Sequence, residues 1–248
     1  MSREEPAAGT LDPALLLGAY SVGVFPMADS RDATDIYWVE PRRRAILPLD
    51  TFHLSRSLRR VIAADRFRVT ADRAFAQIIA LCAEAADDRP DTWINATIER
   101  SFLRLHALGL AHSVECWDGE RLVGGLYGLA IGRAFFGESM VSRATNASKV
   151  AIATLVARLA AGGFTLLDCQ FMTDHLASLG AREIDRADYM ALLGAALSST
   201  GSSAAGSSGA GTAAPPPNAG DFFALDAAAG ADGAVPGKAI VQLLGHTS

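Results

Sequence analysis

The apolar and polar positions along the chain predict short helices and strands in succession. Apolar residues recur at helical spacing in residues 13–22, 55–64, 72–86, 95–108, 146–160, 173–180 and 185–197. Strand-like alternation or short apolar runs occupy residues 37–39, 67–70, 112–117, 122–131, 133–138 and 164–169. The residues that we expect to cap the helices are Asp12, Ser55, Asp72, Asn95 or Thr97, Asn146, Thr173 and Asp185.

The order of these elements predicts an α+β fold. From residue 112 onward, strands joined by hairpins come first, and Asp118-Gly119 is a typical hairpin turn. A helix and a further strand follow, which implies a mixed sheet with helices packed on it. We expect a small N-terminal domain in residues 1–50, a larger domain in residues 51–197, and a linker and tail in residues 198–248.

The tail differs in composition from the rest of the chain. Residues 198–218 are almost entirely Ser, Gly, Ala and Pro, which bury too little apolar surface to offset the cost of ordering. We expect a disordered, low-complexity linker there. Two apolar segments follow it, at residues 222–225 and 239–244. They either dock on the body of the protein or form a weak C-terminal strand.

Composition places the chain among globular proteins. Half of its 248 residues are apolar, enough for a sizeable core, and no apolar run is long enough to span a membrane. The first six residues do not have the basic and then apolar pattern of a signal sequence. We therefore expect a cytoplasmic protein that does not enter a membrane.

The charge is unevenly distributed. The net charge is −5, yet residues 42–73 have an excess of six positive charges. The arginines in this stretch are Arg42, Arg43, Arg44, Arg56, Arg59, Arg60, Arg66, Arg68 and Arg73. A local basic patch on an acidic protein favours an anionic partner. A solvated helix face is the alternative, because Arg replaces Lys almost throughout this chain.

The cysteines and histidines do not indicate a metal or a disulfide framework. Cys82, Cys116 and Cys169 are odd in number and far apart, so we expect buried structural thiols. The histidines are scattered and form no metal-ligand pattern. We therefore expect no metal site.

Polar residues that end apolar strands are the candidates for chemistry. Asp168 and Gln170 lie two apart, so they are expected to share one strand face, with Leu167 and Cys169 on the other. An acid and an amide so placed could bind and orient an amine. The alternative is that Asp168 caps a turn and Gln170 bonds to the backbone.

Glu138 is a second candidate, because a buried carboxylate needs partners. A surface salt bridge with Arg133 or Arg143 is the alternative. Residues 142–149 precede a helix, whose free amides could bind an anion or an oxyanion. Simple capping by Asn146 is the alternative there.

Several motifs recur together in one known family. They include Tyr-Ser-Val-Gly-Val-Phe-Pro at 20–26, Phe-His-Leu-Ser-Arg-Ser-Leu at 52–58, Gly-Glu-Ser-Met at 137–140 and Asp-Cys-Gln at 168–170. Further matches lie at residues 37–38, 92–94, 104–106, 109–117, 124–149 and 168–180. Over roughly residues 11–197 the chain resembles the leucyl/phenylalanyl-tRNA–protein transferases.

The resemblance implies an aminoacyltransferase that takes Leu or Phe, and sometimes Met, from a charged tRNA. The acceptor would be the α-amine of a protein that begins with Arg or Lys, and the product would be marked for N-degron degradation. The implied fold is a small N-terminal domain and a C-terminal domain resembling the GNAT acetyltransferases. The implied enzyme is a monomer that uses no cofactor.

The resemblance also implies roles for individual residues. Asp168, Gln170 and Glu138 would orient the acceptor amine and hold its N-terminal residue. The pocket for the donor side chain would consist of Leu126, Phe135, Ile152, Leu155 and Leu167. Tyr20 and Trp93 would bind the 3′ end of the tRNA. Arg56, Arg59 and Arg60 would contact its phosphates. Two positions depart from the family pattern: Met27 stands where the family has an aromatic residue, and Phe102 stands where it has Tyr.

Two other functions fit parts of the sequence. An N-acyltransferase that uses acyl-CoA would need a Gly-rich turn between a strand and a helix, but residues 142–149 contain no glycine. A non-catalytic RNA-binding module would explain the arginines. It would not explain why Glu138, Asp168 and Gln170 occur together.

Overall fold

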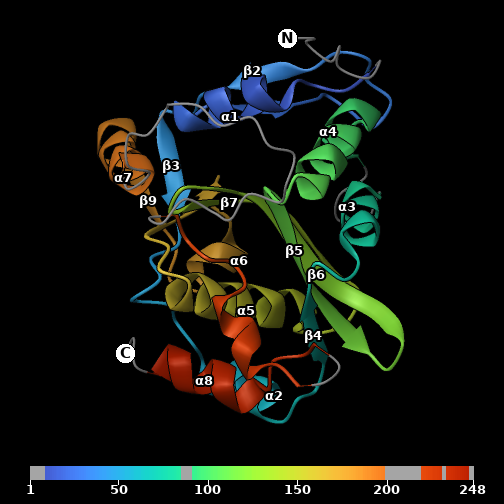
Figure 1. Ribbon diagram of the computed structural model, residues 1–248, viewed down its shortest axis with the longest axis vertical. Coiled ribbons are helices and arrows are strands. Elements are labelled where there is room, and N and C mark those ends of the chain that lie inside the picture. Colours follow the sequence, from blue (N-terminus) through green and yellow to red (C-terminus); the bar gives the residue numbers. More distant parts are fainter. Residues whose placement is uncertain (1–8, 85–90, 199–218, 231–232, 246–248) are drawn as a thin grey trace, which may run out of the picture.

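The computed structural model describes residues 9–84, 91–198, 219–230 and 233–245. Its centre is a seven-stranded sheet with the order β4-β5-β6-β7-β8-β3-β9 (Figure 1). The strands are β3 (Arg43–Ile46), β4 (Arg68–Ala71), β5 (Ala111–Asp118), β6 (Arg121–Ile131), β7 (Ala134–Ser142), β8 (Leu166–Gln170) and β9 (Arg182–Asp185). The α+β class expected from the sequence is confirmed.

The sheet is mixed, as the order of elements predicts. Strands β5, β6 and β7 are joined by tight turns and pair antiparallel. Strand β7 pairs parallel with β8, and helix α5 (Ala147–Ala161) makes the crossover between them. Strands β4, β3 and β9 pair antiparallel with their neighbours.

Helices cover both faces of the sheet. Neighbouring residues on one strand belong to different core clusters: Leu126 packs with α5, whereas Tyr127 packs with the helices of the other face. This alternation is what a strand between two layers requires. One face carries α2 (Arg56–Ala63) and α5, and the other carries α3 (Phe75–Ala83), α4 (Ala96–Ala107) and α7 (Arg186–Ser198).

A small second sheet lies at one end of the molecule, beside helix α1 (Pro13–Ser21) (Figure 1). It consists of β1 (Phe25–Met27) and β2 (Tyr37–Val39), which pair antiparallel. Strand β3 follows within the first 50 residues, but it belongs to the large sheet. The N-terminal part of the chain is therefore joined directly to the central sheet.

Four of the predicted helix caps are confirmed. The side chains of Asp12, Ser55, Asn95 and Thr173 each accept a hydrogen bond from a backbone amide in the first turn. These polar residues satisfy amides that have no partner within the helix. The short helix α6 (Asp174–Ala177) begins after Thr173.

The predictions for Asp72 and Asn146 were wrong. Asp72 has a φ of +54° and bonds to the backbone amide of Ser113 and the ring of His112, so it joins β4 to β5. Helix α3 begins only at Phe75. Asn146 has a φ of +72°, and its side chain does not cap α5. Both residues use the tolerance of Asp and Asn for left-handed backbone.

The C-terminal segment docks on the body of the protein. Residues 199–218 of the predicted linker lie outside the described part of the chain. The two apolar segments beyond them form a 3-10 helix (Ala224–Ala228) and helix α8 (Gly237–Gly245), not a strand. Phe222, Leu225, Ile240 and Leu244 are buried in the same core cluster as α5.

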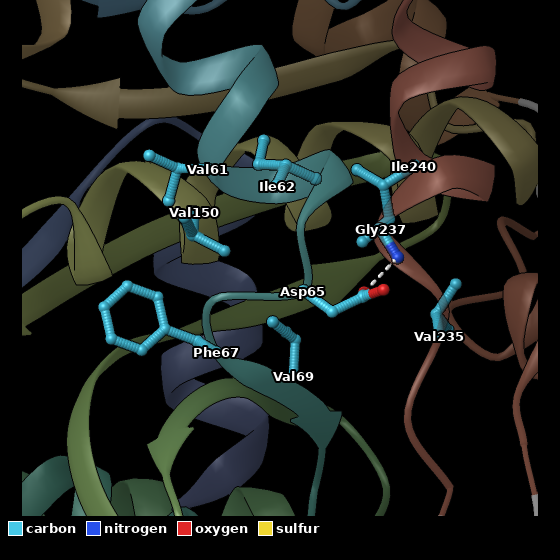
Figure 2. Close-up of a pocket in the computed structure, with 9 residues that line it drawn as sticks. All are labelled: Val61, Ile62, Asp65, Phe67, Val69, Val150, Val235, Gly237 and Ile240. Carbon is cyan, nitrogen blue, oxygen red and sulfur yellow. Dashed lines mark hydrogen bonds between the residues drawn. The ribbon is translucent and has the colours of Figure 1, made fainter.

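Helix α8 is seated closely on α2. Figure 2 shows the seam, where Ile240 and Val235 face Ile62, Val61 and β4. The backbone amide of Gly237 donates to Asp65 at 2.6 Å, and a Cβ at Gly237 would overlap the carbonyl oxygen of Ile62. Only a glycine therefore allows this approach of the two helices.

Across the part of the chain that the structure describes, the helices are all too short or too polar to cross a membrane.

Candidate functional site

The site lies where strands β7 and β8 separate. Their parallel pairing ends at Phe136 and Asp168. Beyond that point β7 pairs only with β6, while β8 continues along β3. Two diverging strands leave room between them for a ligand, in the way that ligands bind at the carboxyl ends of strands in open sheets.

A β-bulge turns Glu138 toward this gap. In the pairing of β6 with β7, Tyr127 faces Ser139 and Gly128 faces Gly137, so Glu138 is the extra residue. Bulges of this kind redirect a side chain and are frequent beside active sites. The Glu138 side chain is thereby placed among the residues that line the gap.

The gap contains a cavity of about 410 Å³. This volume is within the range of small-molecule sites, and most of its walls are apolar. Its lining residues are Leu126, Tyr127, Gly137, Glu138, Ser139, Met140, Ile152, Leu155, Leu167, Cys169, Gln170, Phe171, Thr173, His175 and Leu176. An apolar side chain with a polar backbone group at one end would suit it.

Glu138 is a buried carboxyl with few partners. Its Oε1 accepts a hydrogen bond from Gln170 Nε2 at 3.3 Å, and its Oε2 has no hydrogen-bond partner among the described residues. Desolvation raises the pKa of Glu138 to about 8. The nearby Tyr20 hydroxyl lowers the pKa of Glu138 and so partly offsets this rise. The position of the hydroxyl does not meet the geometry of a hydrogen bond to Glu138.

Asp168 is buried but fully bonded. Its Oδ1 accepts from Arg44 Nε at 2.9 Å, and its Oδ2 accepts from Arg44 Nη2 at 2.7 Å and from the Tyr189 hydroxyl at 2.7 Å. The Asp168 side chain is 0% exposed and does not line the cavity. Burial lowers the pKa of Arg44, but the bonds and charge of Asp168 outweigh this and raise it.

Gln170 has an unusual backbone that brings its side chain to the cavity. Its φ is +56°, a left-handed conformation that is uncommon outside glycine. The carboxylate of Asp168 accepts from the Gln170 amide at 2.8 Å, and the Phe171 amide donates to the Cys169 carbonyl at 2.7 Å. These two bonds hold the turn that ends β8.

The left-handed residue also overturns the expected division of faces. Strand alternation predicted that Asp168 and Gln170 would point together, away from Leu167 and Cys169. In the structure Leu167, Cys169 and Gln170 line the cavity, whereas Asp168 points to Arg44 and Tyr189 on the other side. The positive φ rotates Gln170 out of the regular strand pattern.

Four of the five residues predicted for the aminoacyl pocket line the cavity. Leu126, Ile152, Leu155 and Leu167 line it. Phe135 does not line it, because its ring packs against Phe222 of the C-terminal segment, with ring centroids 5.8 Å apart. Sequence reasoning missed the wall from α6, which brings Thr173, His175 and Leu176 to the site.

The two residues predicted to bind the tRNA 3′ end, Tyr20 and Trp93, differ from each other in their surroundings. The Tyr20 ring is 0% exposed and packs edge-on against Phe136 at 5.1 Å, so it offers no free face for stacking. Only its hydroxyl approaches the site, next to Glu138. Trp93 is half-buried beside the small sheet, and its carbonyl accepts from the Ala28 amide.

The two departures from the family pattern lie near these residues. Met27 is half-buried in β1, where it pairs with Tyr37. Phe102 is fully buried, and its ring meets the Tyr127 ring edge-on at 5.4 Å. Phe102 therefore reaches the site only through Tyr127, one of the lining residues.

The arginines of residues 42–73 do not form one surface. Arg44 is buried in the Asp168 network, and Arg43 pairs with Glu183 and Asp185 across β9. The three arginines of α2, Arg56, Arg59 and Arg60, make no ion pair within the described residues. Arg56 and Arg60 are exposed and Arg59 is half-buried, so a basic group remains on α2.

The first turn of α5 is not free to bind an anion. The amide of Ala147 donates to the carbonyl of Ala144, and the amide of Ser148 donates to Ser142 Oγ at 3.3 Å. The predicted oxyanion site at this helix end therefore has most of its donors in use. The alternative considered for Glu138, a surface salt bridge with Arg133 or Arg143, is absent within the described residues: Arg143 pairs with Glu84, and Glu138 is buried.

Two further titratable groups line the cavity. Burial raises the pKa of the Cys169 thiol, so it is protonated at neutral pH. Burial, followed by the charge of Lys149, lowers the pKa of His175, and its Nε2 has no hydrogen-bond partner among the described residues. No cluster of three metal-ligating side chains is present in the described ranges.

Comparison with known proteins agrees with the resemblance in the motifs. Residues 46–194 match the family model described as leucyl/phenylalanyl-tRNA protein transferase, and residues 9–42 match the model of its N-terminal domain. A relative from Rhizorhabdus wittichii, named leucyl/phenylalanyl-tRNA–protein transferase, is 61% identical over 96% of this chain and 99% of its own length.

Two more relatives have the same name. One from Zymomonas mobilis is 63% identical over 76% of this chain and 70% of its own length. One from Phenylobacterium zucineum is 51% identical over 94% of this chain and 96% of its own length. With the matches to both parts of the fold, they show that this chain is an aminoacyltransferase that belongs to the leucyl/phenylalanyl-tRNA–protein transferase family.

Proposed function

We propose that this protein transfers Leu or Phe, and also Met, from a charged tRNA to the N-terminal α-amine of proteins that begin with Arg or Lys. The product would carry an N-terminal residue that marks it for degradation through the N-degron pathway. One observation carries the proposal: an apolar cavity of about 410 Å³ has the Glu138 and Gln170 side chains, bonded to each other, in its wall. The apolar part of the cavity would accommodate the donor side chain, and the Glu138 and Gln170 side chains beside it would bind the acceptor amine.

The donor side chain would lie against Leu126, Ile152, Leu155 and Leu167. Such a pocket favours Leu, Phe and Met over polar residues because burying a polar group without a partner costs free energy. Its discrimination among apolar side chains is limited, since one methylene is worth only about 1–3 kcal/mol.

The acceptor amine would bind near Gln170 and Glu138. The aminoacyl ester is already activated, and an α-amine with a pKa of about 7.7–8.0 is partly neutral near pH 7. The amine nitrogen attacks the ester carbonyl carbon, and the bond from that carbon to the ribose oxygen breaks. The proton that leaves the amine ends on the ribose hydroxyl. Holding the two reactants together can supply about 7–11 kcal/mol at best.

Glu138 is the carboxyl that suits the amine proton. Its pKa of about 8 is close to that of the α-amine, so a fraction of Glu138 is ionised near neutral pH and can accept the proton. When ionised, its Oε2, which has no hydrogen-bond partner among the described residues, also suits the positive charge of an Arg or Lys at the acceptor N-terminus. Asp168 is an unsuitable acceptor, because Arg44 and Tyr189 bond to its carboxylate and it does not line the cavity.

The tRNA would approach the arginines of α2. Arg56 and Arg60 are exposed, and Arg59 lies beside them. Contacts of arginine with phosphate release counterions, so such binding weakens steeply as salt rises. A cytoplasmic location and a monomeric state remain predictions that belong to this proposal.

The test measures transfer of radiolabelled Leu from Leu-tRNA to two acceptor proteins that differ only in an N-terminal Arg or Ala. Labelling of the Arg protein alone supports the donor, the acceptor and the reaction together. Equal labelling of both would refute the acceptor rule, and no labelling of either would refute the transfer. Glu138→Gln should lower the rate by about 10²–10⁴-fold if Glu138 accepts the proton.

An N-acyltransferase that uses acyl-CoA has less support. Such an enzyme needs backbone amides that bind the pyrophosphate at the start of a helix. The amides of Ala147 and Ser148 at the start of α5 are already bonded within the protein. A control reaction with acetyl-CoA in place of Leu-tRNA should therefore leave the Arg protein unlabelled.

A further inference from the structure

Behind the cavity lies a buried polar network that the transfer steps do not use directly. Asp168 is at its centre, bonded to Arg44 from β3, to the Tyr189 hydroxyl from α7 and to the Gln170 amide. The side chains of Arg44 and Asp168 are 1% and 0% exposed. Each partner comes from a different element, so the network joins distant parts of the chain at one point.

Arg44 is held on every side. Its Nε and Nη2 donate to Asp168, and its Nη1 donates to the Gly23 carbonyl at 3.0 Å. Its guanidinium lies 4.7 Å from the ring centres of both Phe25 and Tyr189. Stacking and forked hydrogen bonds together use the features that distinguish Arg from Lys. Gly23 has a φ of +80°, and a Cβ there would come within 3.0 Å of the Tyr189 ring.

The network ends on the residue with the strained backbone. A left-handed backbone conformation is unfavourable for a non-glycine residue, and it persists only where its surroundings hold it. The bond from the Gln170 amide to Asp168 Oδ1, at 2.8 Å, is one of the two contacts that hold this turn, and it is the one that Gln170 itself makes. If the Asp168 carboxylate rotated, Gln170 could relax to ordinary strand geometry and withdraw its side-chain amide from Glu138.

We propose that Arg44 and Tyr189 are positioning residues for aminoacyl transfer, which fix Asp168 so that Gln170 presents its side-chain amide to Glu138 and to the cavity. This inference rests on the proposed function and deepens it. Neither residue touches the cavity, so both act through Asp168. Arg44 is thereby removed from the basic patch of residues 42–73, for which the sequence favoured an anionic partner.

Substitutions at Tyr189 and Arg44 can disturb the hydrogen bonds to Asp168 to different extents. Tyr189→Phe removes one hydroxyl and keeps the ring that packs on Arg44 and Gly23. Arg44→Lys keeps the positive charge but cannot make the forked contact with the carboxylate. Arg43→Ala is a matched control, because Arg43 is next on the same strand and pairs only with exposed acids of β9.

The experiment measures the single-turnover rate of transfer at saturating Leu-tRNA, together with the Kd for Leu-tRNA. We expect Tyr189→Phe to lower the rate about tenfold and Arg44→Lys about 10²-fold, because a small misplacement of a positioning group costs this much. The Kd should stay within about twofold, and Arg43→Ala should not change the rate. A purely stabilising role would lower the Tm and leave the rate of folded protein unchanged.

A second readout follows Gln170 itself. The side-chain amide signal of Gln170 in a ¹⁵N–¹H spectrum is identified by its loss in Gln170→Ala, and we expect it to shift in Tyr189→Phe but not in Arg43→Ala. If Arg44→Lys fails to fold, Tyr189→Phe decides the matter. If the wild type transfers nothing, the proposed function fails, and the Gln170 signal still tests the network.

Two results overturn the inference. One is a transfer rate within about twofold of the wild type in folded Tyr189→Phe, with the Gln170 signal unmoved. The other is a weaker Kd for Leu-tRNA with an unchanged rate in Arg44→Lys, which would return Arg44 to the phosphate contacts.

Discussion

Replacing Glu138 with Gln should stabilise the protein at neutral and alkaline pH. Glu138 is 8% exposed, and one carboxyl oxygen has no hydrogen-bond partner among the described residues. Desolvation is the main reason that its pKa rises from 4.5 to about 8. Glutamine has nearly the shape of the protonated carboxyl but cannot ionise, so it avoids the cost of a buried charge.

The sign and size follow from the pKa in the folded and unfolded states. Below about pH 4.5 the carboxyl is protonated in both states, so the two proteins should be about equally stable. Between about pH 4.5 and 8 the unfolded wild type releases this proton while the folded protein retains it, so the stability of the wild type falls as pH rises. Above about pH 8 the difference levels off, on the order of 4–5 kcal/mol.

The assay is denaturant unfolding of the wild type and of Glu138→Gln at intervals from pH 5 to pH 9. The quantity of interest is the difference in free energy of unfolding between the two proteins at each pH. Glu120→Gln, at an exposed turn between β5 and β6, is the control for removing one surface carboxyl. It also corrects for general effects of net charge on stability.

A difference that is the same at pH 5 and pH 9, within about 0.5 kcal/mol, would refute the reasoning. It would mean that Glu138 is hydrated or paired in solution, and that its pKa is not raised by burial. The match between Glu138 and the acceptor amine would then lose its basis. A variant less stable than the wild type at pH 9 would have the same consequence.

The remaining predictions concern the C-terminal segment, the pocket and the tRNA surface. Phe222→Ala should destabilise the protein by about 3–5 kcal/mol and Phe223→Ala by much less, because Phe222 is 4% exposed and Phe223 is 44% exposed; thermal unfolding of both variants tests this. Ile152→Phe should reduce transfer of Phe more than transfer of Leu, by about 10-fold or more in relative kcat/KM, because it narrows the cavity. Arg56→Ala and Arg60→Ala should each reduce the slope of log K for tRNA against log salt by about 1, and unchanged slopes would exclude them as phosphate contacts.

Local patterns predicted the hairpins and the crossover well. Strands β5 to β8 and helix α5 have apolar runs, a hairpin turn and Gly162-Gly163 after the helix, and each of these signals is local in the sequence. The edge strand β9 and its neighbour β3 lack such signals. Each has only four residues, Arg-Arg-Ala-Ile in β3 and Arg-Glu-Ile-Asp in β9, and neither shows a regular alternation of charged and apolar positions. The two strands pair with each other although they lie far apart in the sequence.

The caps show where local reasoning fails. Asp72 and Asn146 precede helices and have the right chemistry, yet both adopt positive φ and neither side chain caps the helix that follows it. Asp72 instead satisfies a backbone amide of β5, 41 residues away in sequence. A long-range partner of this kind has no signature in the residues around Asp72.

The residues of the site were predictable, but their roles were less so. The resemblance named Glu138, Asp168 and Gln170, and the structure brings all three together. Which of them faces the cavity depends on the bulge at Glu138 and on the left-handed turn at Gln170. The bulge arises from the pairing of β7 with β6, and the turn is held by the Asp168 carboxylate, which is itself fixed by Arg44 and Tyr189 from other elements. Strand alternation alone therefore assigned Gln170 to the wrong face.

Asp168 and Glu138 have different surroundings, and this difference suits them to different roles. Asp168 and Glu138 both follow apolar strand residues, and nothing in their local sequence tells them apart. Arg44 bonds to both oxygens of Asp168. Among the described residues Glu138 has no ion pair: the Gln170 amide bonds to it, and the Tyr20 hydroxyl lies nearby. Pairs of carboxyls in unlike surroundings divide roles in many enzymes. In the proposed reaction, the paired acid supports the backbone of Gln170, and the acid without a cationic partner among the described residues would meet the charge of the substrate.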